Sequence, residues 1–317
     1  MLGVALSVVV VTLMIWYGFV SFVVTFLVVM GGVAFFTLLE RKFLGYFQMR
    51  LGPNKVGYKG VPQPIADAMK LFLKEFLLPH SSNKFAFMVG PSLMLVLCIG
   101  VWVLYPVLFS SVYYLWSFLL FVCISSSGVY GVIAVGWASN SKYAYLGCVR
   151  AVAQFISYEV VMVMIILVSM LCIESFSMGV FNKVGLWGFF VFTPMFFMWA
   201  LSLLAETNRA PFDFVEGESE LVSGFNVEYG GVGFAMIFIA EYSMILFMGV
   251  MTGVIYFGGV GSGVFFSVML VLGMSSFVVL CRGGLPRFRY DLLMMLTWKY
   301  LLPIVLVFLG VSFIMLK

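Results

Sequence analysis

Long apolar stretches alternate with shorter polar segments along the whole chain. Eight apolar windows are long enough to cross the roughly 30 Å hydrocarbon core of a bilayer as helices, which rise about 1.5 Å per residue. The windows cover residues 3–36, 86–109, 114–137, 148–172, 186–206, 230–256, 262–281 and 299–316. This pattern predicts an all-α membrane protein, an eight-transmembrane-helix bundle.

The polar segments between the windows show how the chain is organised. We expect a single polytopic membrane domain that covers residues 1–317. In the first polar segment, the glycines and prolines from Gly45 to Pro64 are predicted to stop any long helix and to fix a folded turn structure. The larger, inner loops are expected near residues 37–85, 138–147, 206–229 and 282–298.

A short amphipathic helix is predicted near residues 65–78, inside the first inner loop. Its apolar residues recur at helical spacing on one face, and Asp67, Lys70 and Lys74 lie on the other. At about 15 residues it is too short to span a bilayer, so we expect it to lie in the membrane interface. It is either a plain anchor or the frame of an opening between the lipid and the protein interior.

The basic residues are distributed unequally between the two sides of the predicted bundle. Of 17 Lys and Arg residues, 15 fall on the side of the large loops, and only Lys183 and Lys317 fall on the side of the termini. By the positive-inside rule, the large loops face the cytoplasm, or the matrix in a mitochondrion. An even number of spans places both termini on the opposite side.

Composition excludes a soluble domain and indicates no redox cofactor of the chain's own. The sequence is 64% hydrophobic and 9% charged, with a mean hydropathy of +1.16. Its 5 cysteines form no CxxC pair, and its single histidine leaves no pair of ligands for a haem or a di-metal site. We therefore predict no metal site.

The acidic segment from Glu206 to Tyr229 stands between two apolar windows. It contains 6 acids and one base, and aromatic residues are interleaved with the acids. A solvated acidic loop is one interpretation, but disordered acidic segments lack aromatics. A folded loop that packs carboxyl groups against apolar side chains can instead hold, relay or sense protons.

Two further acids, Glu159 and Glu241, lie within predicted spans. An ionised carboxylate at that depth is costly, so we expect both to be buried, to face the bundle interior and to be mostly neutral at pH 7. The alternative is that they only form hydrogen bonds to neighbouring helices. Together with Glu206 they would form a line of carboxyl groups from the inner loop to the middle of the membrane, as a proton path requires.

Four stretches, in order along the chain, resemble one family. They are LERKFLGYFQMRLGPNKVGYKGVPQPIADAMKLFLKE, RAVAQFISYEV, AETNRAPFDFVEGESELVSGFNVEY and PRFRYDLLMMLTWKYLLP. They are similar to the family of membrane subunits that join the hydrophilic arm in respiratory complex I, the proton-pumping NADH:ubiquinone oxidoreductase. The first stretch looks more like mitochondrial versions than bacterial ones. The apolar spans between the stretches fit the family only in hydrophobicity and length.

The resemblance implies a location and partners. It implies a multi-pass protein of the mitochondrial inner membrane, with its large loops toward the matrix and both termini toward the intermembrane space. The expected partners are the quinone-reducing peripheral-arm subunits, the adjacent membrane-arm subunits and membrane lipids, and no nucleic acid. Ubiquinone is the expected substrate, while the redox cofactors reside in other subunits.

The resemblance also implies two functional regions within the chain. One is a funnel of acids that couples quinone reduction to proton pumping, and the other is a tunnel that admits ubiquinone from the bilayer. The residues that match the acidic funnel are Glu159, Glu206, Glu216, Glu218 and Glu241. The residues that match the quinone chamber are Arg41, Arg50, Asp67, Arg209, Asp213, Tyr242, Arg287 and Arg289.

Three other functions compete with this interpretation. A free-standing transporter or channel with intramembrane acids would typically show an inverted repeat, and the sequence contains no visible internal repeat. An inert anchor for a soluble enzyme leaves Glu159 and Glu241 without a role. A quinone-independent relative, such as a membrane hydrogenase subunit, shares the same expected architecture and stays the closest alternative.

Overall fold

The computed structural model describes residues 2–105, 114–181, 187–191, 193–214, 224–259 and 263–315, the first 16 of these as backbone only. All regular secondary structure in these ranges is helical. Seven of the helices are long and apolar enough to cross a membrane. The predicted all-α membrane fold is therefore confirmed.

The described residues form long helices, with a few shorter helical segments. The elements are α1 (Leu2–Phe47), α2 (Gln63–Leu73), α3 (Lys84–Trp102), α4 (Ser117–Ala138), α5 (Lys142–Ile173), α6 (Met178–Phe181), α7 (Trp187–Val191), α8 (Thr193–Glu206), a 3₁₀ turn (Gly224–Asn226), α10 (Gly231–Phe257), α11 (Val264–Gly284), α12 (Tyr290–Met295), a π-helical segment (Leu296–Leu301) and α13 (Leu302–Met315).

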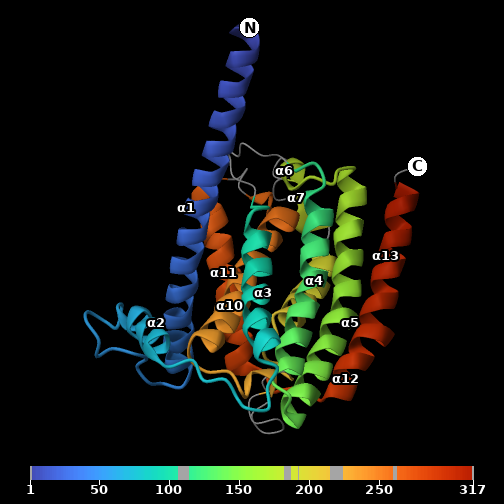
Figure 1. Cartoon of the computed structure of the whole chain (residues 1–317). Helices are drawn as coiled ribbons and strands as arrows, with labels where there is room; N and C mark the ends of the chain where they lie inside the picture. The colour runs from blue at the N-terminus through green and yellow to red at the C-terminus, as the bar shows by residue number, and fades with distance from the viewer. Residues whose placement is uncertain are drawn as a thin grey trace.

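The α10 helix is the centre of the bundle. It packs against α1, α3 and α11, and 61% of its most apolar stretch is buried, compared with 22% for the spans at Gly18–Phe47 and Tyr290–Ile314. Those two spans form opposite edges of the bundle (Figure 1). The ends of α1 and α13 that are nearest the two chain termini lie at the same end of the bundle, as an even number of crossings requires (Figure 1).

Within the described residues, the fifth predicted span, 186–206, contains two shorter helices, α7 and α8. Neither is long enough by itself to cross a membrane. Gly188 in α7 lies against the backbone of Ile255 and Tyr256 near the C-terminal end of α10, whereas Arg209, just after α8, contacts Glu40. The segment therefore connects the two ends of the bundle, and the count of eight spans stays a prediction.

The first helix is longer than its apolar window predicted. α1 continues to Phe47, so the inner loop does not begin near residue 37, and Gly45 does not end the helix. A Cβ atom at Gly45 would lie 3.0 Å from the backbone nitrogen of Gly52, because the chain folds back closely after α1. The glycine therefore permits this close approach instead of breaking the helix.

The predicted amphipathic helix is present as α2, although it ends at Leu73 and not near residue 78. Its apolar residues are exposed, with Ile65 at 62% and Leu73 at 80%. α2 projects from the side of the bundle near the inner end of α1 (Figure 1). Its location in the membrane interface stays a prediction.

Two inner loops are shorter than the sequence predicted. The loop expected at 138–147 is reduced to residues 139–141, because α5 begins at Lys142. The last span begins at Tyr290 and not at 299, so Asp291 belongs to it and not to an inner loop, and Lys299 lies within it and not at its start. Both helices extend beyond their apolar windows, since helical backbone hydrogen bonds form regardless of side-chain polarity.

Candidate functional site

A buried ion cluster lies where α1, α10 and α11 meet. Glu40 continues a stripe of buried residues along α1, formed by Val29, Val33 and Phe36 at spacings of four, three and four residues. This spacing keeps all four side chains on the face that contacts α10. Glu40 is therefore a core residue with a relative exposure of 4%, although its sequence neighbours are charged.

Three donors from distant parts of the chain converge on the Glu40 carboxylate. The Tyr242 hydroxyl donates a hydrogen bond of 2.6 Å to Oε2, and the Arg209 guanidinium lies 3.4 Å from Oε1. Arg282 forms the third contact, also to Oε1. The Arg209 guanidinium also stacks over the Tyr242 ring at 4.6 Å from its centroid. A buried carboxylate is tolerated here because opposite charge and hydrogen bonds compensate for its lost hydration.

A tight turn after α8 positions Arg209. Asn208 has φ +49°, a left-handed conformation that asparagine adopts more readily than most residues. The Arg209 amide then donates to the Leu204 carbonyl at 3.2 Å, which ends the helix. From α5, the buried Gln154 amide group donates to the carbonyls of Ala205 and Phe212, both at 2.9 Å. Gln154 thus stabilises the turn through a hydrogen bond at each of its ends.

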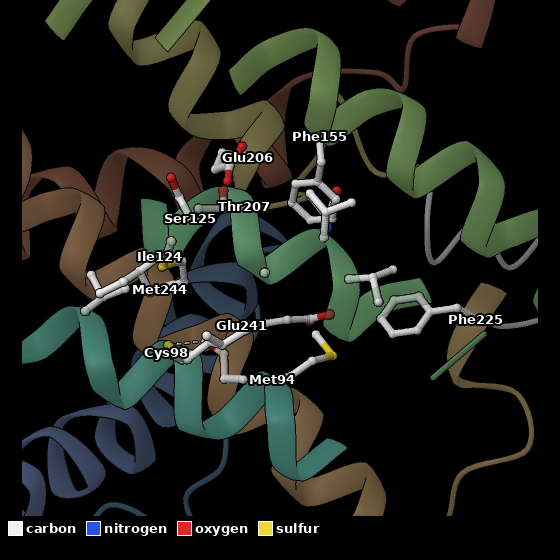
Figure 2. Close-up of a pocket in the computed structure, with 17 residues that line it drawn as sticks. Met94, Cys98, Ile124, Ser125, Phe155, Glu206, Thr207, Phe225, Glu241 and Met244 are labelled. Carbon is white, nitrogen blue, oxygen red and sulfur yellow. Dashed lines mark hydrogen bonds between the residues drawn. The ribbon is translucent and has the colours of Figure 1, made fainter. Parts of the chain in front are cut away.

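A cavity of about 90 Å³ lies next to the same turn. Glu206, Thr207 and Asn208 line it from the end of α8, and Glu241 lines it from α10. Figure 2 shows the Glu241 side chain extending into the middle of the cavity and Glu206 lying at its edge. Since about 10–15 Å³ on this measure is enough to hold one water, the cavity is large enough to be hydrated.

Within the described residues, the Oε2 atom of buried Glu206 has no hydrogen-bond partner. Water in the adjoining cavity would supply one, since buried polar groups are generally satisfied by protein or water. Glu159 is close enough to Glu206 for its charge to act on that carboxyl group. The structure thus brings three of the predicted funnel acids, Glu159, Glu206 and Glu241, into one region.

The expectation that Glu159 and Glu241 are buried is only partly met. Both side chains are half-buried in the isolated chain, whereas Glu206 is 7% exposed. Glu159 lies on the part of α5 near Ile156, which is 50% exposed. Glu159 is therefore close to the lateral surface of the bundle. Glu216 and Glu218, the other predicted funnel residues, lie outside the described residues.

The predicted quinone-chamber residues fall into separate groups. Arg209 and Tyr242 belong to the ion cluster, and Asp213 is half-buried just beyond the same turn. Arg41 and Asp67 form an ion pair of 2.5 Å that ties α1 to α2. This pair is exposed, and Gln63 also donates to Asp67 at 2.9 Å.

The three remaining arginines are not part of the cluster. Arg50 is exposed at the bend that follows α1. Arg287 is half-buried, with its guanidinium 4.9 Å from the centroid of the Phe214 ring. Arg289 is 82% exposed and pairs with Asp291 at 3.2 Å.

Two residues of the cluster, Glu40 and Arg282, were not among the predicted site residues. The sequence contains a signal for Glu40, since it continues the buried spacing of α1 beyond the end of the apolar window. No local signal identifies Arg282, which reaches Glu40 across 242 positions in the sequence. Among the described residues, no group of three or more His, Cys, Asp or Glu side chains is placed to hold a metal ion.

The fold and the site define a polytopic membrane protein that keeps a charge cluster and a carboxyl-lined cavity within its helices. The sequence model of the NADH dehydrogenase family matches residues 20–313, and the chain belongs to that family. It is 55% identical over 280 residues to NADH-ubiquinone oxidoreductase chain 1 of Heterololigo bleekeri, which covers 86% of this chain and 89% of that protein.

Two further relatives bear the same name. The protein of Mytilus edulis is 48% identical over 297 residues, covering 92% of this chain and 95% of the relative. The protein of Aedes aegypti is 50% identical over 277 residues, covering 87% of this chain and 88% of the relative. The similarity therefore runs through nearly the whole bundle and not only through its loops.

Proposed function

We propose that this chain is a core membrane subunit of the proton-translocating NADH:ubiquinone oxidoreductase, respiratory complex I. Its similarity to proteins named NADH-ubiquinone oxidoreductase chain 1 supports this role. In this role the chain works in the mitochondrial inner membrane, ubiquinone is the substrate, and the other complex I subunits are its partners. That the chain has no redox cofactor of its own stays a prediction.

The proposed quinone path enters beside α2 and leads toward the ion cluster. A quinone tail needs an apolar route, and the exposed apolar side chains of α2 provide one next to the inner end of α1. The polar head needs a few hydrogen-bonding groups, which Arg209 and Tyr242 can supply. Arg41 and Asp67 hold α2 against α1 at the entrance.

The proposed proton path begins at the cavity. The observation that supports it most strongly is that Glu206 and Glu241 share a cavity large enough for water, while Arg209 lies only three residues beyond Glu206. A change in charge at the cluster is therefore transmitted through one short turn to a carboxyl group in the cavity. Glu159 extends this line toward the outer surface of the bundle, where an adjacent subunit would continue it.

The test is to replace Glu206 and Glu241 by glutamine, one at a time, in the assembled complex. Glutamine keeps the size and hydrogen bonding of the side chain but cannot exchange a proton. We expect both variants to assemble and to show impaired proton pumping coupled to quinone reduction, measured in proteoliposomes. The matched control is Glu174→Gln, an exposed acid at the far end of α5, which should pump normally.

If both cavity variants pump normally, these acids are structural and the proton path is wrong. The inert-anchor interpretation would then explain the chain better. The proposed orientation has a separate test, since a membrane-impermeant amine reagent should modify Lys55 only from the matrix side. Modification of Lys55 from the intermembrane space would contradict that orientation.

A further inference from the structure

The last span contains a lysine at a depth where a charged side chain is costly. Lys299 is exposed and belongs to the 25-residue span Tyr290–Ile314. At about 1.5 Å per residue, it lies about 14 Å from Tyr290 along the helix and within about 5 Å of the middle of the span. An ammonium group at such a depth is unfavourable unless it is paired or faces water.

Contacts with α5 support this depth independently. The Tyr158 hydroxyl donates to the Leu293 carbonyl at 3.5 Å, and the Ser157 hydroxyl contacts the Met294 sulfur at 3.6 Å. Tyr158 and Ser157 lie halfway along α5, so the first turn of α12 already packs beside the middle of that helix. Lys299 lies further along the same direction, well away from the inner ends of the helices.

An unusual backbone segment surrounds the lysine. Residues Leu296–Leu301 form a π-helical turn, a rare conformation that is frequent at functional sites. Within it, Trp298, Lys299 and Tyr300 are all exposed, whereas Thr297 and Leu301 on either side are buried. The wide turn thus presents two aromatic rings and an ammonium group together on the outer surface of the bundle.

Neither the described residues nor the lipid headgroups explain how this charge is compensated. No ion pair or hydrogen bond between described residues involves the Lys299 side chain. With the middle of the span placed at the bilayer centre, a lysine stem of about 6 Å leaves the ammonium group several ångströms short of the headgroups, which begin about 15 Å from that centre. A carboxylate at the same depth, carried by another protein, can reach it directly.

We propose that Trp298, Lys299 and Tyr300 form a docking site for a transmembrane helix of a partner subunit that carries an Asp or Glu at this depth. The inference rests on the proposed function, because it requires assembly with other membrane subunits. The carboxylate pairs with the Lys299 ammonium group. The rings of Trp298 and Tyr300 pack around the pair and keep lipid tails away from it.

The first part of the test measures assembly. In the full complex, Lys299→Gln should lower the amount of assembled enzyme on native gels by about tenfold or more, because a buried charge pair loses one partner. Lys299→Arg should assemble normally because it keeps the charge. The control is Lys142→Gln, which removes an exposed lysine at the start of α5 and should assemble normally.

The second part identifies the occupant of the site. A photoreactive phenylalanine analogue in place of Tyr300 should form an adduct with a partner's transmembrane segment, identified by mass spectrometry. Lys299→Glu should block assembly, and a lysine at an acid within the labelled segment should restore it. Lipid adducts alone, or failure of every such reversal, would overturn the proposal. A Lys299→Gln complex that assembles, reduces quinone and pumps normally would also overturn it, yet leave the proposed function intact.

Discussion

The buried cluster around Glu40 makes a sharp prediction for the variant Glu40→Gln. This change removes one negative charge while keeping the size of the side chain. The amide oxygen can still accept the hydrogen bond of the Tyr242 hydroxyl. Arg209, however, loses the negative charge of Glu40 in a site where the two side chains are only 7% and 6% exposed.

The burial of each partner sets the size of the effect. Removing one member of a buried ion pair costs about 3–5 kcal/mol, because the other charge stays buried and loses the attraction of its partner. The 3.4 Å separation between Arg209 and Glu40 is long for a charged hydrogen bond, which favours the lower end of that range. Arg282 is 35% exposed, so its pairing with Glu40 adds only about 0–1 kcal/mol. We therefore expect a loss of about 3 kcal/mol.

The assay is thermal inactivation of the purified complex, with activity normalised to its starting value. If half of the loss lowers the barrier to unfolding, the half-life shortens by about tenfold. The control is Asp291→Asn, which breaks the exposed pair with Arg289 and should shorten the half-life by less than about twofold.

A double variant tests whether the charge of Arg209 is the cause. Adding Arg209→Gln to Glu40→Gln also removes the positive charge that Glu40 balanced, so the pair of changes should cost less than the sum of the two single changes. Equal half-lives for Glu40→Gln and Asp291→Asn would refute the reasoning. Strict additivity in the double variant would show that the two groups do not interact.

Two further predictions concern packing and the turn that positions Arg209. Gly136→Ala should sharply reduce the amount of assembled complex on native gels, because the added Cβ would lie 2.3 Å from the Cβ of Cys148. The control Gly100→Ala, whose added Cβ has nothing within 4 Å, should assemble normally. Equal assembly of both variants would contradict this packing argument. Gln154→Leu should leave the Ala205 and Phe212 carbonyls without their donor. The assembled complex should stay detectable, but its apparent KM for ubiquinone should rise. An unchanged KM would show that the turn does not depend on Gln154.

The sequence predicted most of the bundle because hydropathy reports which segments can face lipid. The predicted spans agree with the structure best where an apolar window and a helix have the same length, as in α4 and α10. Agreement fails where a helix extends beyond the hydrocarbon region. The inner ends of α1 and α5 carry charged side chains, so hydropathy assigned them to loops although the helical backbone continues.

The same limitation explains the misassigned charges. Glu40 was placed in an inner loop, and Lys299 at the first position of the last window, because charged residues normally end an apolar window. In the structure, Glu40 has a buried position opposite Arg209, while Lys299 lies on an exposed part of the last span. Burial and pairing depend on neighbouring helices, and hydropathy along one helix does not contain that information.

The candidate site was predicted unevenly for a related reason. The acids were identified because a carboxyl group in an apolar window is conspicuous in sequence. The partners that organise the site are distant, since Gln154 reaches Ala205 and Phe212 over 51 and 58 positions, and Glu40 meets Arg209 over 169 positions. Such pairings follow from how the helices pack, and single-sequence patterns do not specify them.

The most direct test of the central claim uses a photoreactive, long-tailed ubiquinone analogue with the intact complex. The quinone should pass along α2 and the inner half of α1 toward Tyr242. Labelled peptides should therefore fall within residues 40–80 or in the inner half of α10, and excess ubiquinone should suppress the labelling. Labelling confined to the loops at the opposite end of the bundle, or labelling that ubiquinone does not suppress, would contradict the account.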